Sequence, residues 1–364
     1  MHLAVLTLDF PPGVGGVQTY LYEITQRLAT SHQVTVITPV TGVLPAAAAM
    51  RTLAPKSRIA SDFRRALSSL RPDRVLVGHA HPQLLLAASL YRQVGYAAIT
   101  YGNDYLAAQK RWHRPFFNWL LRRSRPLVTI TQANADRLRT LAMPTPRIVY
   151  PGSDPSRFSP SPVPTSGPPT LLTVGRLVRR KGIDTVLESL PRLIPEHPAL
   201  RYRIVGDGPD RERLQRCSEQ LGLKQMVTFL GRVTEAQLPN LYRQAHVFVM
   251  VAREEHDSAS MEGFGIVYLE ASASGLPVVA GDSGGAAEAV MDGVTGFLVP
   301  PNDPERLAGA LRKLLADPQL RQRQGLVGRR WVEDEMNWDH AARKMSDALE
   351  LSAVPCNGLS EGSR

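Results

Sequence analysis

Short apolar runs alternate with stretches of helical periodicity along nearly the whole chain. Strands are predicted where an apolar run is continuous, and helices where apolar residues recur every three or four positions, as between residues 17 and 28. The predicted strands lie at residues 3–8, 34–38, 74–78, 97–100, 127–131, 147–150, 171–174, 202–205, 227–229, 246–251 and 277–280. This alternation predicts an α/β protein with doubly wound parallel sheets.

A proline-rich segment divides the pattern into two similar halves. Residues 159–169 hold five prolines in eleven positions, which excludes the interior of a helix or strand. We therefore predict two Rossmann-like domains, at residues 1–158 and 170–336, joined by this linker. A final helix is predicted at residues 337–351, followed by a flexible tail at residues 352–364.

The composition is globular, but the charge is uneven. Of 364 residues, 43% are hydrophobic and 21% charged, which excludes wholesale disorder, collagen and a coiled coil. Residues 1–160 hold 19 Lys and Arg against 7 Asp and Glu, a net charge of +12, whereas the remaining residues hold 24 against 26, a net charge of −2. The N-terminal domain is therefore expected to meet an anionic partner.

Cysteine usage and hydropathy limit the location. Cys217 and Cys356 are too few and too far apart for a disulfide framework or a CxxC metal site. The first apolar run is too short for a signal peptide, and no run reaches the ~18 residues of a membrane span. We expect a soluble, cytoplasmic protein that is at most peripheral at the inner face of the cell membrane.

A glycine loop lies between the first predicted strand and the first helix. Gly13, Gly15 and Gly16 expose backbone N–H groups that suit an anion at a helix N-terminus. The loop does not match the dinucleotide fingerprint G-x-G-x-x-G, and a tight structural turn explains it equally well.

The second half carries a basic turn after its first strand. Gly175 and Arg176 are followed by two arginines, Lys181 and Gly182, and Arg and Lys together suit phosphate oxygens. The alternative is a solvated basic turn. The next strand ends in Gly-Asp-Gly-Pro at residues 206–209, which by itself is an ordinary turn.

Two carboxylates bound an apolar segment at residues 262–270. Gly263 and Gly265 stand where a loop enters a helix, so the segment offers backbone amides to a sugar or phosphate, and Glu270 suits paired ribose hydroxyls. The alternative makes Glu262 and Glu270 surface charges of a helix. Further glycines at residues 281–285 and 292–296 fit either a ligand-binding edge or turns.

These motifs together resemble the retaining GT-B glycosyltransferases of family 4. The resemblance covers nearly the whole chain and is carried by FPPGVGGVQTY, PGSDPSRF, VGRLVRRKG, VGDGPD, EGFGIVYLEA, GDSGGAAE and DGVTGFLVPPND. The opening motif and the loop at residues 253–261 look most like bacterial mannosyltransferases that modify inositol phospholipids. The resemblance implies two facing domains with a cleft between them, and a last helix that crosses back to the first domain.

The resemblance also implies a reaction. A hexose of the mannose or glucose type passes from a nucleoside diphosphate sugar, bound by the C-terminal domain, to a hydroxyl of a sugar, polyol or lipid-linked acceptor bound by the N-terminal domain. GDP-mannose is the first expectation, ahead of UDP-glucose and UDP-N-acetylglucosamine. No cofactor or metal is expected, and the sequence has no Asp-x-Asp pair. The alternatives are a nucleotide-sugar epimerase on the same scaffold and a catalytically silent nucleotide-sugar binder.

The resemblance assigns roles residue by residue. Arg176 and Lys181 neutralise the departing diphosphate, Glu262 faces the sugar and Glu270 holds the ribose. The donor is further contacted through backbone groups of Gly15, Gly16, Gly175, Phe264, Gly265, Ile266 and Val267.

One element departs from the family pattern. Related mannosyltransferases carry a T-H-G-H-E element, where this chain has Tyr101, Asn103 and Asp104 at the corresponding positions. Tyrosine, with an ordinary pKa of about 10, is a poor base at neutral pH, so the acceptor can differ from a phospholipid inositol. The acceptor-side candidates are Asp9, His79, His81, Tyr101, Asn103 and Asp104; the two histidines alone do not make a metal site.

The densest basic and aromatic stretch spans residues 110–125. Such a stretch suits a helix lying in an anionic lipid interface. The alternative places Phe116, Leu120 and Leu121 in a core with the arginines in water. No recognisable nucleic-acid module accompanies the stretch, so we expect no nucleic-acid partner.

Overall fold

The structure, a computed structural model, describes residues 1–40, 50–56, 58–109, 113–161, 167–255 and 261–351. The chain divides into two units: one holds Met1–Thr129, Leu138–Val149 and Ala341–Arg364, and the other Ile130–Arg137 and Tyr150–His340. The main division thus falls ahead of the proline-rich segment. Much of that segment, and the whole predicted tail, lie outside the described residues.

The first unit contains a parallel sheet of seven strands in the order β3-β2-β1-β4-β5-β6-β7. The strand order reverses at β1, which pairs with both β2 and β4, and in such sheets ligands bind beside the carboxyl ends of the strands near this reversal. The strands are β1 (His2–Leu6), β2 (Gln33–Ile37), β3 (Met50–Leu53), β4 (Arg74–Val77), β5 (Tyr96–Thr100), β6 (Leu127–Thr129) and β7 (Arg147–Ile148).

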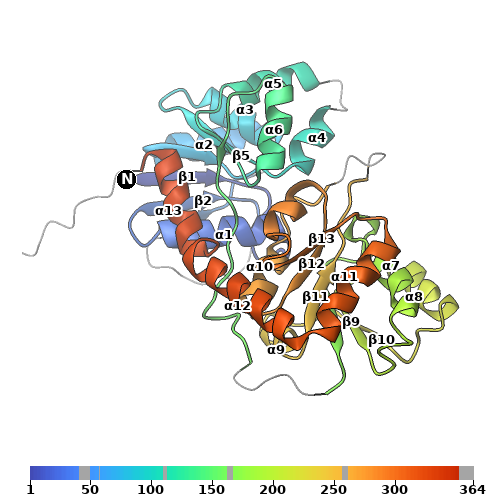
Figure 1. The fold of residues 1–364 in the computed structure, drawn as a ribbon. Coiled ribbons are helices and arrows are strands. Elements are labelled where there is room, and N and C mark those ends of the chain that lie inside the picture. The colour runs from blue at the N-terminus through green and yellow to red at the C-terminus, as the bar shows by residue number, and fades with distance from the viewer. Residues whose placement is uncertain (41–49, 57, 110–112, 162–166, 256–260, 352–364) are drawn as a thin grey trace, which may run out of the picture. The chain divides into compact units, whose positions relative to one another are not determined.

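Helices cover both faces of this sheet (Figure 1). The helices are α1 (Gly16–Leu28), α2 (Ala60–Leu70), α3 (Pro82–Leu90), α4 (Asn103–Gln109), α5 (Arg114–Arg122), α6 (Gln132–Thr140) and α13 (Trp338–Leu349), of which α6 and α13 each have residues in both units. Phe63 of α2, Leu84 of α3 and Phe117 of α5 join one core cluster with the strands, and α1 packs on the opposite face.

The second unit repeats the design with six parallel strands in the order β10-β9-β8-β11-β12-β13. The strands are β8 (Thr170–Val174), β9 (Arg201–Val205), β10 (Val227–Gly231), β11 (Val247–Met250), β12 (Val278–Gly281) and β13 (Gly296–Val299). The helices are η1 (Arg179–Lys181), α7 (Ile183–Ser189), η2 (Leu190–Arg192), α8 (Arg211–Gln220), α9 (Leu238–Arg243), α10 (Ile266–Ala273), η3 (Gly284–Ala289), α11 (Pro304–Ala316) and α12 (Pro318–Asp334).

Two layers of helices enclose the second sheet (Figure 1). On one face α7, α8 and α11 contribute Leu187, Leu214 and Leu311 to a single apolar cluster with the strands. On the other face α9 and α10 pack on β11 through aromatic contacts of Phe248 with Tyr242 and Tyr268. The strand ends that carry the motifs are therefore set on a sheet whose central strands β8, β11 and β12 are buried.

The predicted doubly wound architecture is confirmed, and each predicted strand overlaps an observed one. β3 and β13 were not predicted. β3 is an edge strand with mostly exposed residues, and β13 begins at Gly296 inside a segment that also fits turns. In the described part of the chain, no helix is long and apolar enough to cross a membrane.

Candidate active site

The basic turn follows β8 in the second unit. Arg176 is exposed, whereas Lys181, the last residue of η1, is only 7% exposed. Gly182 then adopts a left-handed φ of 63°, and a Cβ built on it would lie 1.9 Å from the carbonyl oxygen of Val251. Only glycine fits this position, so the turn is pressed against the end of β11 and holds Lys181 inside the unit.

The carboxylate of Glu262 pairs with two cations of this turn. It contacts the guanidinium of Arg180, and its Oε2 lies 2.8 Å from Nζ of Lys181. Burial alone would raise the pKa of Glu262, but Lys181 and Arg180 hold it below its ordinary value. The sequence pointed to Lys181 and Glu262 separately; their pairing and the part of Arg180 were missed.

The segment after Glu262 leads directly into α10. Gly265 is the N-cap in a left-handed conformation, Ile266 and Val267 form the first turn, and the Phe264 side chain is buried. The first N–H groups of a helix have no partner within it, which leaves those of this turn for an acceptor outside the helix. The four predicted backbone positions therefore lie together at one helix start.

Glu270 lies one turn further into α10 and is partly buried. Its Oε2 accepts a hydrogen bond of 2.7 Å from the Tyr242 hydroxyl, the one group among the described residues that hydrogen-bonds this carboxylate. Burial raises the pKa of Glu270 to about 7, against the opposing effect of that hydrogen bond. Since Glu262 is buried and Glu270 is partly buried, the alternative of two surface charges is wrong.

Glycines bring the neighbouring loops into contact. A Cβ on Gly206 would lie 1.9 Å from the carbonyl oxygen of Gly175, and one on Gly285 would lie 2.0 Å from that of Gly263. The glycines at residues 206–208 and 281–285, which also fitted ordinary turns, thus allow the loops after β9 and β12 to support the basic turn and the α10 loop.

In the first unit, the glycine loop leads into α1. Gly15 is the N-cap, and Gly16 begins the helix with open space on its Cβ side. Asp9, which follows β1, is exposed, and its Oδ1 lies 3.5 Å from Nε2 of Gln18. The loop therefore offers both backbone amides and a carboxylate at the carboxyl end of β1.

The two histidines after β4 have different environments. His79 is buried, its Nδ1 lies 3.4 Å from Oγ1 of Thr7, and burial lowers its pKa to about 4 despite the opposing charge of Asp9. His81 caps α3 by accepting a hydrogen bond from the Gln83 amide. At neutral pH His79 is thus an uncharged hydrogen-bonding group.

Asp104 connects the loops after β4 and β5. Its carboxylate accepts hydrogen bonds of 2.9–3.3 Å from the backbone amides of Ala80, Tyr101, Gly102 and Tyr105. Burial nevertheless raises its pKa to about 6. The carboxylate is therefore occupied in holding backbone in place.

Tyr101 and Asn103 flank that connection. The Tyr101 hydroxyl is buried and has no hydrogen-bond partner among the described residues, and burial raises its pKa well above the ordinary value. Asn103 is exposed as the first residue of α4. Tyr101 is therefore protonated at neutral pH.

Within the described ranges, no group of three or more His, Cys, Asp or Glu is placed to hold a metal.

α5 combines a core face with an exposed aromatic face. Leu120 and Leu121 are buried, whereas Phe116 and Trp119 are 47% and 49% exposed and stack at 5.9 Å. Arg123 lies 5.0 Å from the Trp119 ring centre. The alternative that placed these residues in a core is right for the two leucines and wrong for Phe116. Residues 110–112 of the stretch lie outside the described residues.

Family models match both halves of the chain. Residues 14–157 match Glycosyltransferase Family 4, and residues 156–331 match Glycosyl transferases group 1. The chain is 32% identical, over 95% of its length and 98% of the relative's, to the GDP-mannose-dependent alpha-(1-6)-phosphatidylinositol monomannoside mannosyltransferase of Mycolicibacterium smegmatis.

Solved structures show the same fold. Sucrose-phosphate synthase from Thermosynechococcus elongatus superposes with a TM-score of 0.80 at 22% identity, covering 95% of this chain and 97% of that one. Anabaena HepE in complex with UDP and glucose gives a TM-score of 0.78 at 18% identity, with 96% and 99% covered. The predicted GT-B fold is confirmed, and the epimerase alternative is not favoured.

Proposed function

This chain belongs to glycosyltransferase family 4 and transfers a sugar from a nucleotide sugar, and on that premise we propose that it is a retaining, metal-independent mannosyltransferase. Its donor is GDP-mannose, and its acceptor is a hydroxyl of a lipid-linked, anionic molecule. The observation that carries the proposal is the pairing of Glu262 with Arg180 and Lys181 in the basic turn that follows β8, a turn that also carries the exposed Arg176.

The cation cluster suits a leaving diphosphate. Arg180 and Lys181 pair with the single carboxylate of Glu262, and together with the exposed Arg176 they give the turn a net positive charge for the donor phosphates. As the bond from the sugar C1 to the β-phosphate oxygen breaks, GDP keeps the electron pair, and Arg176 and Lys181 stabilise the developing charge. Protein cations supply here what a metal ion supplies in other transferases.

The acceptor enters on the same face of the sugar as the leaving group. Its hydroxyl oxygen forms the new bond to C1 and passes its proton to an oxygen of the leaving phosphate, so the anomeric configuration is retained. His79 is neutral and Tyr101 is protonated, and neither is a strong base at neutral pH, which favours this assistance by phosphate.

The remaining donor contacts come from α10. The backbone amides at residues 264–267 bind sugar hydroxyls and phosphate, and the Glu270 carboxylate accepts from the ribose hydroxyls. Tyr242 fixes the orientation of that carboxylate through a hydrogen bond of 2.7 Å. Glu262 lies at the sugar side of the same segment.

The acceptor proposal rests on the relative and on charge. The 32% identical relative from Mycolicibacterium smegmatis is named for a phosphatidylinositol monomannoside, and the basic excess of this chain falls on residues 1–160. The exposed pair Phe116 and Trp119, beside Arg122 and Arg123, suits the surface of an anionic membrane. We place the enzyme at the cytoplasmic face of the cell membrane.

A transfer assay with GDP-mannose and inositol-phospholipid vesicles tests the proposal. Lys181→Ala and Arg176→Ala are each expected to lower kcat by about a hundredfold, since each removes a charge that stabilises the leaving group. Arg179→Ala, which removes an exposed charge from the same turn, is the matched control and is expected to keep activity within about twofold.

Three outcomes contradict parts of the proposal. Full activity of Lys181→Ala overturns the assignment of the site. A product with inverted anomeric configuration by NMR overturns retention, and loss of activity with EDTA that Mg²⁺ restores overturns metal independence. Turnover of UDP-glucose but not of GDP-mannose reassigns the donor.

A further inference from the structure

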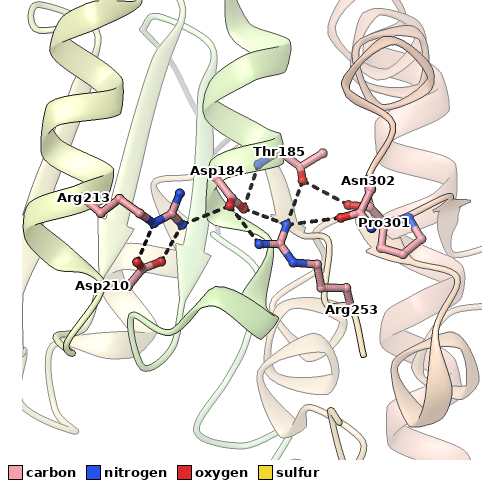
Figure 2. Close-up of polar contacts among 7 residues, drawn as sticks. All are labelled: Asp184, Thr185, Asp210, Arg213, Arg253, Pro301 and Asn302. Atoms are coloured by element: carbon pink, nitrogen blue, oxygen red, sulfur yellow. Dashed lines mark hydrogen bonds and ion pairs between the residues drawn. The ribbon is translucent and has the colours of Figure 1, made fainter. Parts of the chain in front are cut away.

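A second cluster of charged side chains centres on the start of α7, the helix that follows the basic turn (Figure 2). Asp184 of α7 stands at its centre: its two oxygens accept hydrogen bonds of 3.0 and 2.8 Å from the guanidinium of Arg253, and a third of 3.0 Å comes from Arg213. Arg213 also binds Asp210 through two hydrogen bonds of 2.6 and 2.7 Å. Paired bonds of this kind fix direction as well as distance.

The two carboxylates and Arg253 are largely removed from water, whereas the Arg213 side chain is 34% exposed. Asp184 and Asp210 are 9% and 8% exposed, and the Arg253 side chain is 17% exposed. Burying such charges costs desolvation energy that the pairing roughly offsets, so net stabilisation alone does not account for them. What the cluster adds is a fixed geometry.

Arg253 connects the two sides of the turn. Its backbone N–H donates to the carbonyl oxygen of Arg180 at 2.8 Å, while its side chain holds Asp184. Gly182 lies between these two anchored residues and is pressed against Val251. The segment that carries Arg180 and Lys181 is therefore clamped at both ends by one residue.

The same clamp reaches the loop that follows β13. Arg253 also contacts Oδ1 of Asn302 at 3.3 Å, and the hydroxyl of Thr185, next to Asp184, donates to the carbonyl oxygen of Pro301 at 3.0 Å. Figure 2 shows these groups converging on Arg253 from separate elements. The start of α7 and the loop that follows β13 thus meet at the guanidinium of Arg253, a residue that itself follows β11.

We propose that Asp184 and Arg253 form a positioning pair that holds the backbone of the Arg180–Lys181 turn in the geometry that binds the donor diphosphate. This inference rests on the proposed function of that turn. Both residues act through the backbone and the helix start rather than by touching the donor.

Binding of GDP and of guanosine by Arg253→Lys and Asp184→Asn tests the pair. Arg253→Lys keeps every charge but loses the bidentate geometry, and Asp184→Asn removes the central carboxylate. In each folded variant the Kd of GDP is expected to rise about tenfold, and that of guanosine by less than about twofold, because only GDP uses the cations. A general loosening of the unit would instead raise the Kd of GDP and the Kd of guanosine equally.

Two controls accompany the variants. Arg312→Lys makes the same change at an arginine that binds Glu196 at 2.8 and 3.0 Å on the surface of the same unit, and is expected to leave both affinities unchanged. Lys181→Ala reports on the turn itself and is expected to weaken GDP and spare guanosine. If Asp184→Asn fails to fold, the GDP and guanosine affinities of Arg253→Lys alone test the positioning pair.

The outcomes separate the inference from the proposed function. If Lys181→Ala weakens GDP but Arg253→Lys and Asp184→Asn do not, the site stands and the positioning pair is overturned. Equal losses for GDP and guanosine in the pair's variants also overturn it. If Lys181→Ala leaves GDP binding unchanged, the site assignment fails and the inference fails with it.

Discussion

Glu262 and Glu270 lie close together in sequence but have opposite pKa shifts. Lys181 and Arg180 hold the pKa of Glu262 below its ordinary value. Burial raises the pKa of Glu270 to about 7, against the hydrogen bond from Tyr242 and the charge of Arg157. The Glu262 carboxylate is thus held in its charged form at neutral pH, and the Glu270 carboxylate changes charge near neutral pH. Environment rather than residue type separates their roles.

Donor binding is therefore expected to depend on pH through Glu270. Protonation removes an acceptor for the ribose hydroxyls, so the Kd of GDP should rise as pH falls through about 7. Tyr242→Phe removes the hydrogen bond that favours the ionised form, so the midpoint should move to higher pH. Titrations followed by calorimetry between pH 5.5 and 8.5, on the order of one point per half unit, check this.

The control for that titration is Tyr202→Phe, which removes another buried hydroxyl of the same unit, one that contacts Thr173. Its midpoint should equal that of the wild type; equal shifts in both variants would contradict the assignment to Glu270. The free energy of unfolding depends on pH in the opposite direction. Because the pKa of Glu270 is raised in the folded state, its contribution to stability is present below its ordinary pKa of 4.5 and is lost as pH rises through about 7.

At the residue scale, the sequence could predict which residues take part in the site but not which side chains contact one another. Lys181, Glu262 and Glu270 stand out because their residue types flank glycine-bounded turns. The contact between Arg180 and Glu262 joins positions 82 residues apart, and no spacing rule reveals it. Tyr242 carries no local signal either, since an aromatic residue on an apolar helix face is ordinary core.

At the element scale, continuous apolar runs predicted the strands, and departures from them explain what was missed. β3 reads Met-Arg-Thr-Leu and leaves most of its residues exposed, so burial does not impose an apolar pattern on it. β13 is an edge strand of the second sheet, and it begins with Gly296, whose backbone packs against Val278 of β12. Edge position alone does not hide a strand, since the edge strands β7 and β10 were predicted; β3 lacks an apolar pattern, and β13 starts at a glycine that also fits a turn.

The tight approach of η1 to β11 leads to a test with two glycines. Gly182 and Gly222 both have positive φ, 63° and 70°, but a Cβ on Gly222 would meet nothing within 4 Å, whereas one on Gly182 would clash with Val251. Gly222→Ala should cost about 1 kcal/mol of stability, and Gly182→Ala about 3 kcal/mol or more. Thermal unfolding compares them; equal losses would contradict close packing as the cause.

At the scale of the whole molecule, charge distinguishes the two halves. Residues 1–160 carry the entire net positive charge, while the remainder is close to neutral. This asymmetry was readable from composition alone, because it needs no knowledge of contacts. Which aromatic residues accompany the charge on the surface was not, because Phe116 and Phe117 are adjacent yet one is exposed and the other buried.

Membrane binding is expected to follow that exposed pair. Replacing Phe116 and Trp119 together by serine should lower partition onto vesicles rich in anionic lipid by about tenfold or more, through lost apolar burial. Leu326→Ser, at a residue as exposed as Trp119 but on α12, is the control and should leave partition unchanged. Co-sedimentation measures both; binding to neutral vesicles that is as strong and insensitive to salt would contradict the electrostatic part.

The glycine contacts of the second unit have a consequence for engineering. Gly182, Gly206 and Gly285 each leave room for the backbone of a neighbouring loop, so the loops pack directly against one another. Changing donor preference by transplanting a single loop from a relative would therefore introduce side chains or curvature that its neighbours cannot accept. Successful grafts should exchange the loops after β8, β9, β11 and β12 as one set.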